Sequence, residues 1–389
     1  MNKATAIDLV ERARALAPLI RQEADAIERS RRLTEPVVSA LVENGLYRAL
    51  LPKSLGGAEV PLATFMQMQE EIAKADASTA WCLGQCSVCA VISAYIDHDA
   101  ADEIFNTRQG ILAWGAVNHD VRAEPGGYRA NARWEFASGV RQASWLGAHV
   151  RITEADGTPR RKADGSPEIR TILFPLASAT LYDVWDVIGL RGTGTDSYSV
   201  DHLFIPEKFA ALRDEPSALR EKGPLYKIPT NAIYSMGFAA TSLGVARAQF
   251  DAALELSRKK TPQGLSAMKE NSAVQGLIGL TEAKLRRARA YLFATAAEVF
   301  DDLAHGPFTE GHRVALRLAA TSTIHQSTEI VDTAYHMAGA TAVFRANGFE
   351  RRLRDMHAIN QQLQARDSHY EDMGKAILSG NLVGPPMSR

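Results

Sequence analysis

The stretch Arg133-Trp-Glu-Phe-Ala-Ser-Gly139 places aromatic residues at alternate positions and ends in a serine and a glycine. This pattern predicts a β-strand that ends in a turn, with an exposed hydroxyl at its tip. Two further segments of the sequence are interpreted together with this one. Gly189-Leu-Arg-Gly-Thr-Gly-Thr195 is a glycine-rich turn, and Arg354-Asp-Met-His357 lies on the charged face of a predicted helix.

The bulk composition indicates a soluble globular protein. A chain of 389 residues is long enough for two or three domains. With 23% charged residues and a formal net charge of −1, it has no electrostatic reason to bind nucleic acid or an anionic membrane. We expect no apolar run long enough to span a bilayer, and Met1 to Ala6 lead into charged helical sequence without an apolar signal region. These features predict a cytoplasmic protein.

All three cysteines, Cys82, Cys86 and Cys89, share one face of a predicted helix. This spacing admits a metal site, but their neighbours are small and apolar and no fourth ligand stands at a zinc-like spacing. Buried free cysteine behaves as a small hydrophobic residue. We therefore predict three packed thiols and no metal.

The pattern of apolar residues changes twice along the sequence, from helical to β-type and back to helical. Residues 1–110 predict an N-terminal helical domain, because apolar residues recur at helical spacing. Residues 111–228 hold short β-type runs between turn residues and predict a small β domain, with the runs at 111–117, 128–136, 148–153, 171–174 and 198–204. Residues 229–389 predict a helical bundle, with long helices at 266–304, 311–340 and 349–378.

In this order and at these separations, the three segments quoted at the start resemble the acyl-CoA dehydrogenase superfamily of flavoproteins. The resemblance covers the chain from about Leu46 to about Leu378. It implies a mainly α fold with an N-terminal helical domain, a barrel-like β domain and a C-terminal four-helix bundle. The forms Trp-x-Phe-x-Ser-Gly and Arg-Asp-Met-His-Ala look most like the oxygenase components of two-component flavin monooxygenases.

The resemblance implies that Phe136 and Ser138 contact the flavin ring, with the serine near the ring nitrogen N5. A flavin needs a flat apolar wall and hydrogen-bond partners at its edge. The alternative is a β-turn whose serine bonds only to the local backbone. Trp81 and, with a weaker case, Trp114 resemble tryptophans near the ring, and the alternative for both is a core aromatic residue.

The segment Gly189–Thr195 lacks the lysine of a phosphate-binding loop, and its glycines do not fit the dinucleotide fingerprint. We interpret it as a structural turn at the border of the site. Since no nicotinamide-binding module is visible, reducing equivalents must come from the substrate or from a separate flavin reductase. The resemblance further implies that Arg258 and Gly339 contact the cofactor, FAD or FMN, of a neighbouring subunit in a homotetramer. An arginine at a helix end also caps carbonyls.

The C-terminal helix separates the branches of the superfamily. Where one dehydrogenase branch has its catalytic glutamate, this chain has Leu363. Where phenol-hydroxylating oxygenases carry a histidine, it has Gln361 and Gln362. Glutamine orients a hydroxyl but takes up no proton. His357 is a candidate acid or base, and its alternative is a structural partner of Asp355.

The candidate catalytic residues are therefore Ser138, His357, Gln361 and Gln362. The resemblance implies an oxygenase that uses reduced flavin and O2 on a small aromatic, heterocyclic or amine substrate. Two alternatives stay open. One is an FAD-containing dehydrogenase or oxidase with a non-standard base, and the other is a non-catalytic relative.

Overall fold

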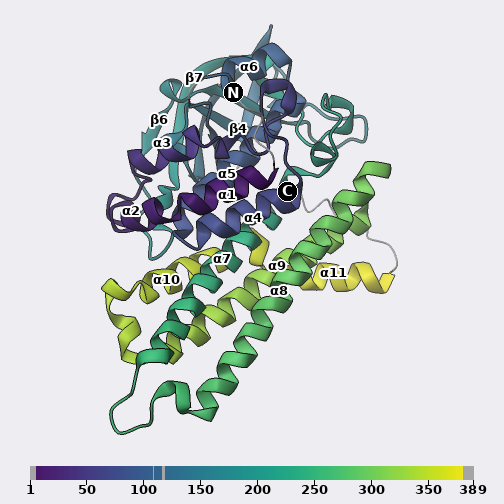
Figure 1. Cartoon of the computed structure of the whole chain (residues 1–389). Helices are drawn as coiled ribbons and strands as arrows, with labels where there is room; N and C mark the ends of the chain where they lie inside the picture. Colours follow the sequence, from purple (N-terminus) through teal and green to yellow (C-terminus); the bar gives the residue numbers. More distant parts are fainter. Residues whose placement is uncertain (1–5, 108, 116–118, 380–389) are drawn as a thin grey trace.

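The computed structural model describes residues 6–107, 109–115 and 119–379. Its elements follow in the predicted order of helices, strands and long helices, so the predicted fold class is confirmed. In Figure 1, helices α7 to α11 form a layer below the strands and the N-terminal helices. We propose that the domain limits lie near residues 110 and 228, between α6 and β1 and between β8 and α7.

The N-terminal domain contains an apolar helix, α5, which packs against α4 of the same domain and against α7. Within the residues that the structure describes, the α-helices of this region are α1 (Ala6–Ala15), α2 (Ala17–Ser30), α3 (Glu35–Glu43), α4 (Leu62–Ala73), α5 (Ala77–Cys89) and α6 (His98–Phe105). Helix α5 begins at Asp76, whose carboxylate accepts a hydrogen bond of 2.7 Å from the Thr79 amide. A side chain of this type satisfies a backbone N–H that the first helical turn leaves without a partner.

One expectation about this helix needs correction. The segment Ala77–Tyr95 is long and apolar enough to span a membrane, although no such run was expected from the sequence. In the fold, 94% of its most apolar window is buried against other elements. It is therefore the core helix of the N-terminal domain, and its apolar character reflects packing on all sides.

The β domain is a mixed sheet. Within the described residues it has the order β6-β7-β3-β2-β4-β5-β8, with β1 paired to β4 at the side. The pairs β1–β4 and β2–β4 are parallel and the remaining pairs are antiparallel. The strands are β1 (Leu112–Trp114), β2 (His119–Glu124), β3 (Gly127–Ala137), β4 (Trp145–Thr153), β5 (Ile169–Pro175), β6 (Thr180–Tyr182), β7 (Asp196–Pro206) and β8 (Ala210–Ala211).

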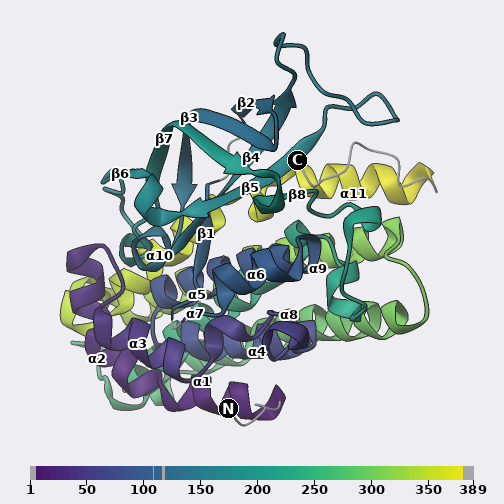
Figure 2. The ribbon, with the colours of Figure 1, turned by 90° about the horizontal axis from the view of Figure 1, so that it is seen from above.

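Strands β1, β3, β4, β5 and β7 coincide with predicted β-type runs. Strands β2, β6 and β8 were not predicted, because β2 is polar and the other two have three and two residues. Such short or polar strands carry little periodic signal. Figure 2 shows the sheet stacked on the α-helices, so its inner face and the helices share one core.

The C-terminal helices are α7 (Thr230–Lys259), α8 (Ser272–His305), α9 (Glu310–Ala338), α10 (Phe349–Asn360) and α11 (Ser368–Ser379). Helix α7 contacts α8, α9 and α10 as well as α4 and α5 of the N-terminal domain. It is buried along its first half. Helix α7 thus joins the two helical regions and passes beside α5, where the candidate site begins.

The single helix predicted over 349–378 is two helices, α10 and α11, separated by a 3-10 turn at Leu363–Ala365. Side chains of α9 bind the carbonyls at this break: Thr321 donates to the Gln364 carbonyl at 2.8 Å, and His325 lies 2.7 Å from the Ala365 carbonyl. These tertiary bonds stabilise an interruption for which the sequence has no proline or glycine.

Candidate flavin site at the end of strand β3

The last residues of β3 form a β-bulge that turns Phe136 outward. The pairing between β3 and β7 shifts register between Trp134 and Ala137. Phe136 adopts a φ of +59° and leaves 59% of its surface exposed. A positive φ is costly for an aromatic residue, and bulges of this kind re-aim side chains beside functional sites. The predicted aromatic strand end is therefore present, in a conformation that the sequence did not indicate.

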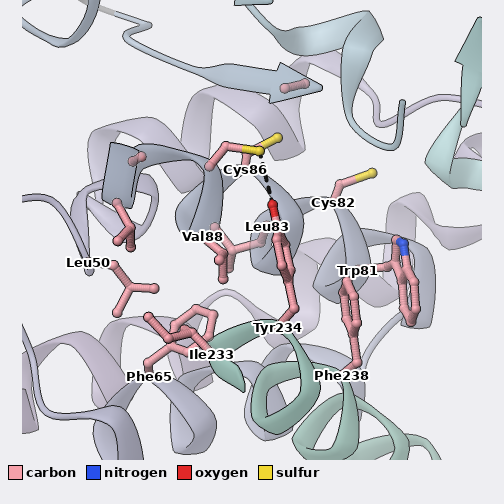
Figure 3. Close-up of a cluster of buried hydrophobic side chains, with 14 of the residues drawn as sticks. Leu50, Phe65, Trp81, Cys82, Leu83, Cys86, Val88, Ile233, Tyr234 and Phe238 are labelled. Atoms are coloured by element: carbon pink, nitrogen blue, oxygen red, sulfur yellow. Dashed lines mark hydrogen bonds between the residues drawn. The ribbon is translucent and has the colours of Figure 1, made fainter. Parts of the chain in front are cut away.

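Next to the bulge, Trp81 of α5 is stacked on Phe238 of α7. Their ring centroids are 3.7 Å apart and their planes differ by 4°. Tyr234, one turn earlier on α7, continues the stack at 5.6 Å from Phe238. Figure 3 shows the two rings face to face between the two helices. The result is a rigid aromatic wall at the contact of α5 and α7.

A hydrogen bond joins this wall to the strand end. The indole Nε1 of Trp81 donates to Ser138 Oγ at 3.1 Å. Ser138 Oγ lies 2.7 Å from Thr195 Oγ1, which lies 2.7 Å from Thr193 Oγ1. The fold thus brings together the predicted residues Trp81 and Ser138, and the Ser138 side chain bonds across domains and not to its own turn.

The glycine-rich turn is held against α10. A Cβ on Gly189 would lie 2.0 Å from the Arg354 carbonyl oxygen, so only glycine permits this contact. The Leu190 amide donates to Asp355 Oδ1 at 2.7 Å, and Arg354 donates to the Ile188 carbonyl at 2.6 Å. The Arg-Asp pair of the third quoted segment therefore positions the turn that carries Thr193 and Thr195.

Burial and, to a smaller extent, the nearby Asp76 carboxylate raise the pKa of Asp355 to about 7. The hydrogen bond from the Leu190 amide acts in the opposite direction, because it favours the charged form. Asp355 is thus a buried acid that titrates near neutral pH and holds the backbone of the turn.

The three cysteines lie in the core. All three are free and buried, and a Cβ on Gly139 (φ +80°) would lie 2.6 Å from Cys86 Sγ. Cys89 Sγ lies 3.2 Å from the Tyr234 hydroxyl. Burial raises the pKa of Cys82 and of Cys89 to about 12. Within the described residues, no group of three His, Cys, Asp or Glu side chains could hold a metal ion.

The structure does not bring Trp114 to the Trp81 ring. Trp114 is buried in β1 with its ring edge against His149, at 5.1 Å between centroids. Its surroundings are those of a core aromatic residue of the β domain. Desolvation and the nearby Arg213 hold the pKa of His149 well below its usual value, so this buried histidine is neutral.

Arg258 and Gly339 lie at the other end of the bundle. Arg258 is exposed near the last turn of α7, and Gly339 ends α9 with a φ of +59°. Lys260 connects the two ends, since its Nζ donates to the Ala338 carbonyl at 2.8 Å. With a rise of about 1.5 Å per residue, Arg258 lies about 30 Å along α7 from Phe238. Within one chain, these residues and the Trp81–Ser138 contact are separate.

His357, Gln361 and Gln362 gather at the end of α10. His357 Nε2 lies 2.9 Å from Asp332 Oδ1 of α9, so its partner is Asp332 and not the expected Asp355. Gln361 caps the helix in an exposed position, and Gln362 is extended and half-buried. These side chains therefore belong to one helix end whose arrangement is set by the break before α11.

Sequence reasoning missed Thr193, Thr195, Tyr234 and Phe238. The threonines stood inside a quoted motif, where alternation with glycine was the available signal. No local signal distinguished Phe238 from other apolar residues of α7. Its role depends on the packing of α7 on α5, which only the tertiary fold decides.

The residues at this site fit a flavin. A flavin ring needs an apolar aromatic surface and a polar contact at its edge. Phe136 exposes its ring at the bulge, Trp81 and Phe238 form a flat wall, and Ser138 Oγ uses only one of its two lone pairs in the contact with Trp81.

Two family models match the chain. The acyl-CoA dehydrogenase N-terminal domain matches residues 6–104, and the acyl-CoA dehydrogenase C-terminal domain matches residues 236–366. The chain belongs to the acyl-CoA dehydrogenase superfamily. The curated relatives to which it is similar include oxygenase components of flavin-dependent monooxygenases.

Among the relatives, indole-3-acetate monooxygenase of Pseudomonas putida is 26% identical over 89% of this chain and 87% of its own length. The oxygenase subunit HsaA of a flavin-dependent monooxygenase from Rhodococcus jostii (strain RHA1) is 28% identical, over 90% and 92%. XiaF from Streptomyces sp., solved in complex with FADH2 and glycerol, has a TM-score of 0.89 at 21% identity, over 98% and 97%. This last likeness concerns the fold.

Proposed function

We propose that this chain is the oxygenase component of a two-component monooxygenase that binds reduced FAD or FMN and uses O2 on a small aromatic, heterocyclic or amine substrate. One observation carries the proposal: Ser138 Oγ is held at 3.1 Å by Trp81 beside an exposed aromatic strand end. The oxygenase relatives and the FADH2 complex of XiaF support it.

When bound, reduced flavin would supply the electrons that activate O2. Trp81, Phe238 and Phe136 would form the apolar surroundings of the ring and exclude water, which strengthens each polar contact in the site. Ser138 would accept a hydrogen bond from the N–H at ring position N5 and so hold this proton in place. This chain's residues thus provide orientation and desolvation.

The end of α10 supports a substrate class that needs no strong base. Gln361 and Gln362 carry amides, which orient a substrate group but take up no proton. We propose them as substrate-contacting residues. His357, paired with Asp332 at 2.9 Å, is the remaining titratable candidate at this helix end. Oxygenation of a substrate nitrogen or sulfur atom removes no proton from carbon. It is therefore the reaction that fits these two glutamines and one histidine best.

The rival function is an FAD-containing dehydrogenase or oxidase. It would need a carboxylate where Leu363 stands, and the nearest residues in sequence are glutamines and an alanine. No contact in the described residues favours it. The second rival is a non-catalytic relative. It does not explain why Phe136 is exposed and held at a positive φ.

We extend the proposal to partners. A separate flavin reductase would supply the reduced cofactor, as the name oxygenase subunit implies for HsaA. Large apolar side chains of α8 are exposed in the single chain, among them Leu277, Leu280 and Tyr291 at 38%, 54% and 44%. A face of this kind suits a subunit contact. We propose a homotetramer in the cytoplasm, and sedimentation at micromolar concentration tests the assembly.

The test of function is anaerobic titration with reduced FMN and reduced FAD, followed by rapid mixing with oxygenated buffer. The expected result is saturable binding of reduced flavin and a long-lived absorbance in the near ultraviolet after mixing. Tight retention of oxidised FAD without that absorbance, and bleaching by an acyl substrate under nitrogen, would support the dehydrogenase. A protein that binds neither oxidised nor reduced flavin would contradict both.

A further inference from the structure

The hydroxyl of Ser138 is the second link in a chain of hydrogen bonds that crosses three parts of the fold. The chain runs from Trp81 Nε1 on α5 to Ser138 Oγ after β3, and then to Thr195 Oγ1 and Thr193 Oγ1 in the turn before β7. It ends at the Leu190 carbonyl, 2.8 Å from Thr193 Oγ1. Both threonines and Ser138 are buried.

The two ends of the chain determine the direction of every bond in it. A carbonyl oxygen only accepts, so the single proton of Thr193 is donated to Leu190. The proton between Thr195 and Thr193 must then come from Thr195, and the proton between Ser138 and Thr195 must come from Ser138. At the other end, an indole N–H only donates, so Trp81 donates to Ser138.

Ser138 Oγ therefore donates its only proton to Thr195 and uses one lone pair to accept the hydrogen bond from Trp81. A hydroxyl has one donor and two acceptor positions. What remains is one lone pair, so this hydroxyl offers any ligand an acceptor and no donor. Ser138 is 5% exposed and follows the exposed Phe136 by two residues, at the surface of the proposed ring site.

The end of the chain at Leu190 is firmly positioned. The Leu190 carbonyl also accepts from Trp185 Nε1 at 2.9 Å, and its amide donates to Asp355. Leu190 has a φ of +51°, which its neighbours must stabilise. Because these contacts hold the Leu190 carbonyl in place, it remains the acceptor for Thr193. The donor-to-acceptor direction of the hydrogen bonds from Ser138 to Leu190 is therefore preserved.

We propose that Thr195 and Thr193 are positioning residues that make Ser138 an acceptor and thereby make the site select reduced over oxidised flavin. This inference rests on the proposed function. Reduced flavin carries a hydrogen at N5, which matches an acceptor. Oxidised flavin has a lone pair at N5, which would face the lone pair of Ser138. A polar mismatch of this kind discriminates strongly, because both groups are left without a partner.

The test compares the dissociation constants of oxidised and reduced FMN and FAD in wild type and variants, under anaerobic conditions for the reduced forms. Wild type should bind the reduced form more tightly. In Thr195→Val, the Ser138 proton loses its acceptor and becomes free to meet the N5 lone pair. The ratio of the oxidised to the reduced dissociation constant should fall about tenfold.

Two variants separate hydrogen-bond direction from general damage. Thr195→Ser retains the hydroxyl and should restore the wild-type ratio. Trp81→Phe removes the donor at the other end, but it leaves the Ser138 proton on Thr195. Both forms of flavin should then bind more weakly while the ratio stays close to that of wild type.

A buried control is Thr171→Val. The Thr171 hydroxyl lies 2.9 Å from His149 Nδ1, at hydrogen-bond distance, and does not belong to the chain of hydrogen bonds from Trp81 to Leu190. It should leave the ratio unchanged. If Thr195→Val does not fold, as judged by circular dichroism, Thr193→Val replaces it. Without Thr193 the Thr195 proton can turn to Ser138, and the ratio should again fall.

The outcomes separate this inference from the proposed function. Wild-type preference for reduced flavin with an unchanged ratio in the folded valine variants would overturn the inference and leave the function intact. Equal wild-type affinity for the two forms would also overturn it. A wild type that binds neither form would remove the function itself, and the inference with it.

Discussion

Helix α10 and the residues that directly follow it present two contrasting regions within about two turns. At Asp355 the helix is buried, and its side chain and those of its neighbours hold the turn that carries Thr193 and Thr195. Around His357, Gln361 and Gln362, at the break before α11, the chain is partly exposed. In the function that we propose, the first region positions the flavin site and the second contacts the substrate.

The contrast teaches how this fold separates two tasks. Ser138 must keep a defined hydrogen-bond direction, so its partners are buried and each is bonded in turn. Substrate contacts need no such rigidity. Changes in the buried region should therefore cost stability and flavin binding together, whereas changes at the helix end should alter turnover alone.

The largest loss of stability is expected from Gly189→Ala. The new Cβ would lie 2.0 Å from the Arg354 carbonyl oxygen, so the turn and α10 must separate. We expect the free energy of unfolding to fall by about 3 kcal/mol, measured by urea denaturation. The matched control is Gly374→Ala on α11, where no atom lies within 4 Å of the added carbon. There helix propensity should raise stability by up to about 1 kcal/mol. Equal stability of the two variants would refute the close contact.

The pH dependence of the free energy of unfolding tests whether Asp355 is protonated in the folded protein. Its pKa is about 7 in the fold, while an aspartate in an unfolded chain has a pKa of about 3.9. Because the folded state holds this proton more strongly, the contribution to stability is fully present below pH 4 and is lost as the pH rises through 7.

Asp355→Asn does not titrate at this position. The stability of the variant relative to wild type should therefore increase by about 4 kcal/mol between pH 4 and pH 8. Urea unfolding of both proteins across this range measures the difference. A difference that stays constant with pH would show that Asp355 is ionised throughout.

Ser138→Ala tests the polar contact at the ring edge. The variant removes the acceptor for N5–H and leaves the Trp81 indole N–H without its bond. We expect binding of reduced flavin to weaken about tenfold, measured by anaerobic titration. Ser197→Ala, a buried serine on β7, is the control and should bind reduced flavin as wild type does. Unchanged binding in Ser138→Ala would exclude the serine as a flavin contact.

The smallest effects should come from Gln361→Ala and Gln362→Ala. Since both residues lie at a partly exposed helix end, the free energy of unfolding should change by about 0.5 kcal/mol or less, and binding of reduced flavin should not change. Turnover of a substrate, once found by screening aromatic and heterocyclic amines, should fall. A marked loss of flavin affinity in either variant would show that the helix end belongs to the cofactor site.

Much of the fold could be predicted from local sequence. Helical periodicity located α8 and α9, and alternating residues located β3 and β7, because these elements follow their intrinsic spacing. The break between α10 and α11 could not be predicted, since Thr321 and His325 of a distant helix stabilise it. The partner of His357 was wrong for the same reason, as Asp332 lies on α9.

The sequence by itself identified the superfamily, through the resemblance of three motifs to it, and it predicted the strand end at Ser138, because aromatic alternation and a following glycine are local patterns with local causes. Only the tertiary structure decided that Trp81 bonds to Ser138 and stacks on Phe238, and that Thr193 and Thr195 continue the chain to Leu190. The physical reason is that a hydrogen bond depends on distance and direction between atoms that are far apart in the chain. The folded core alone provides both.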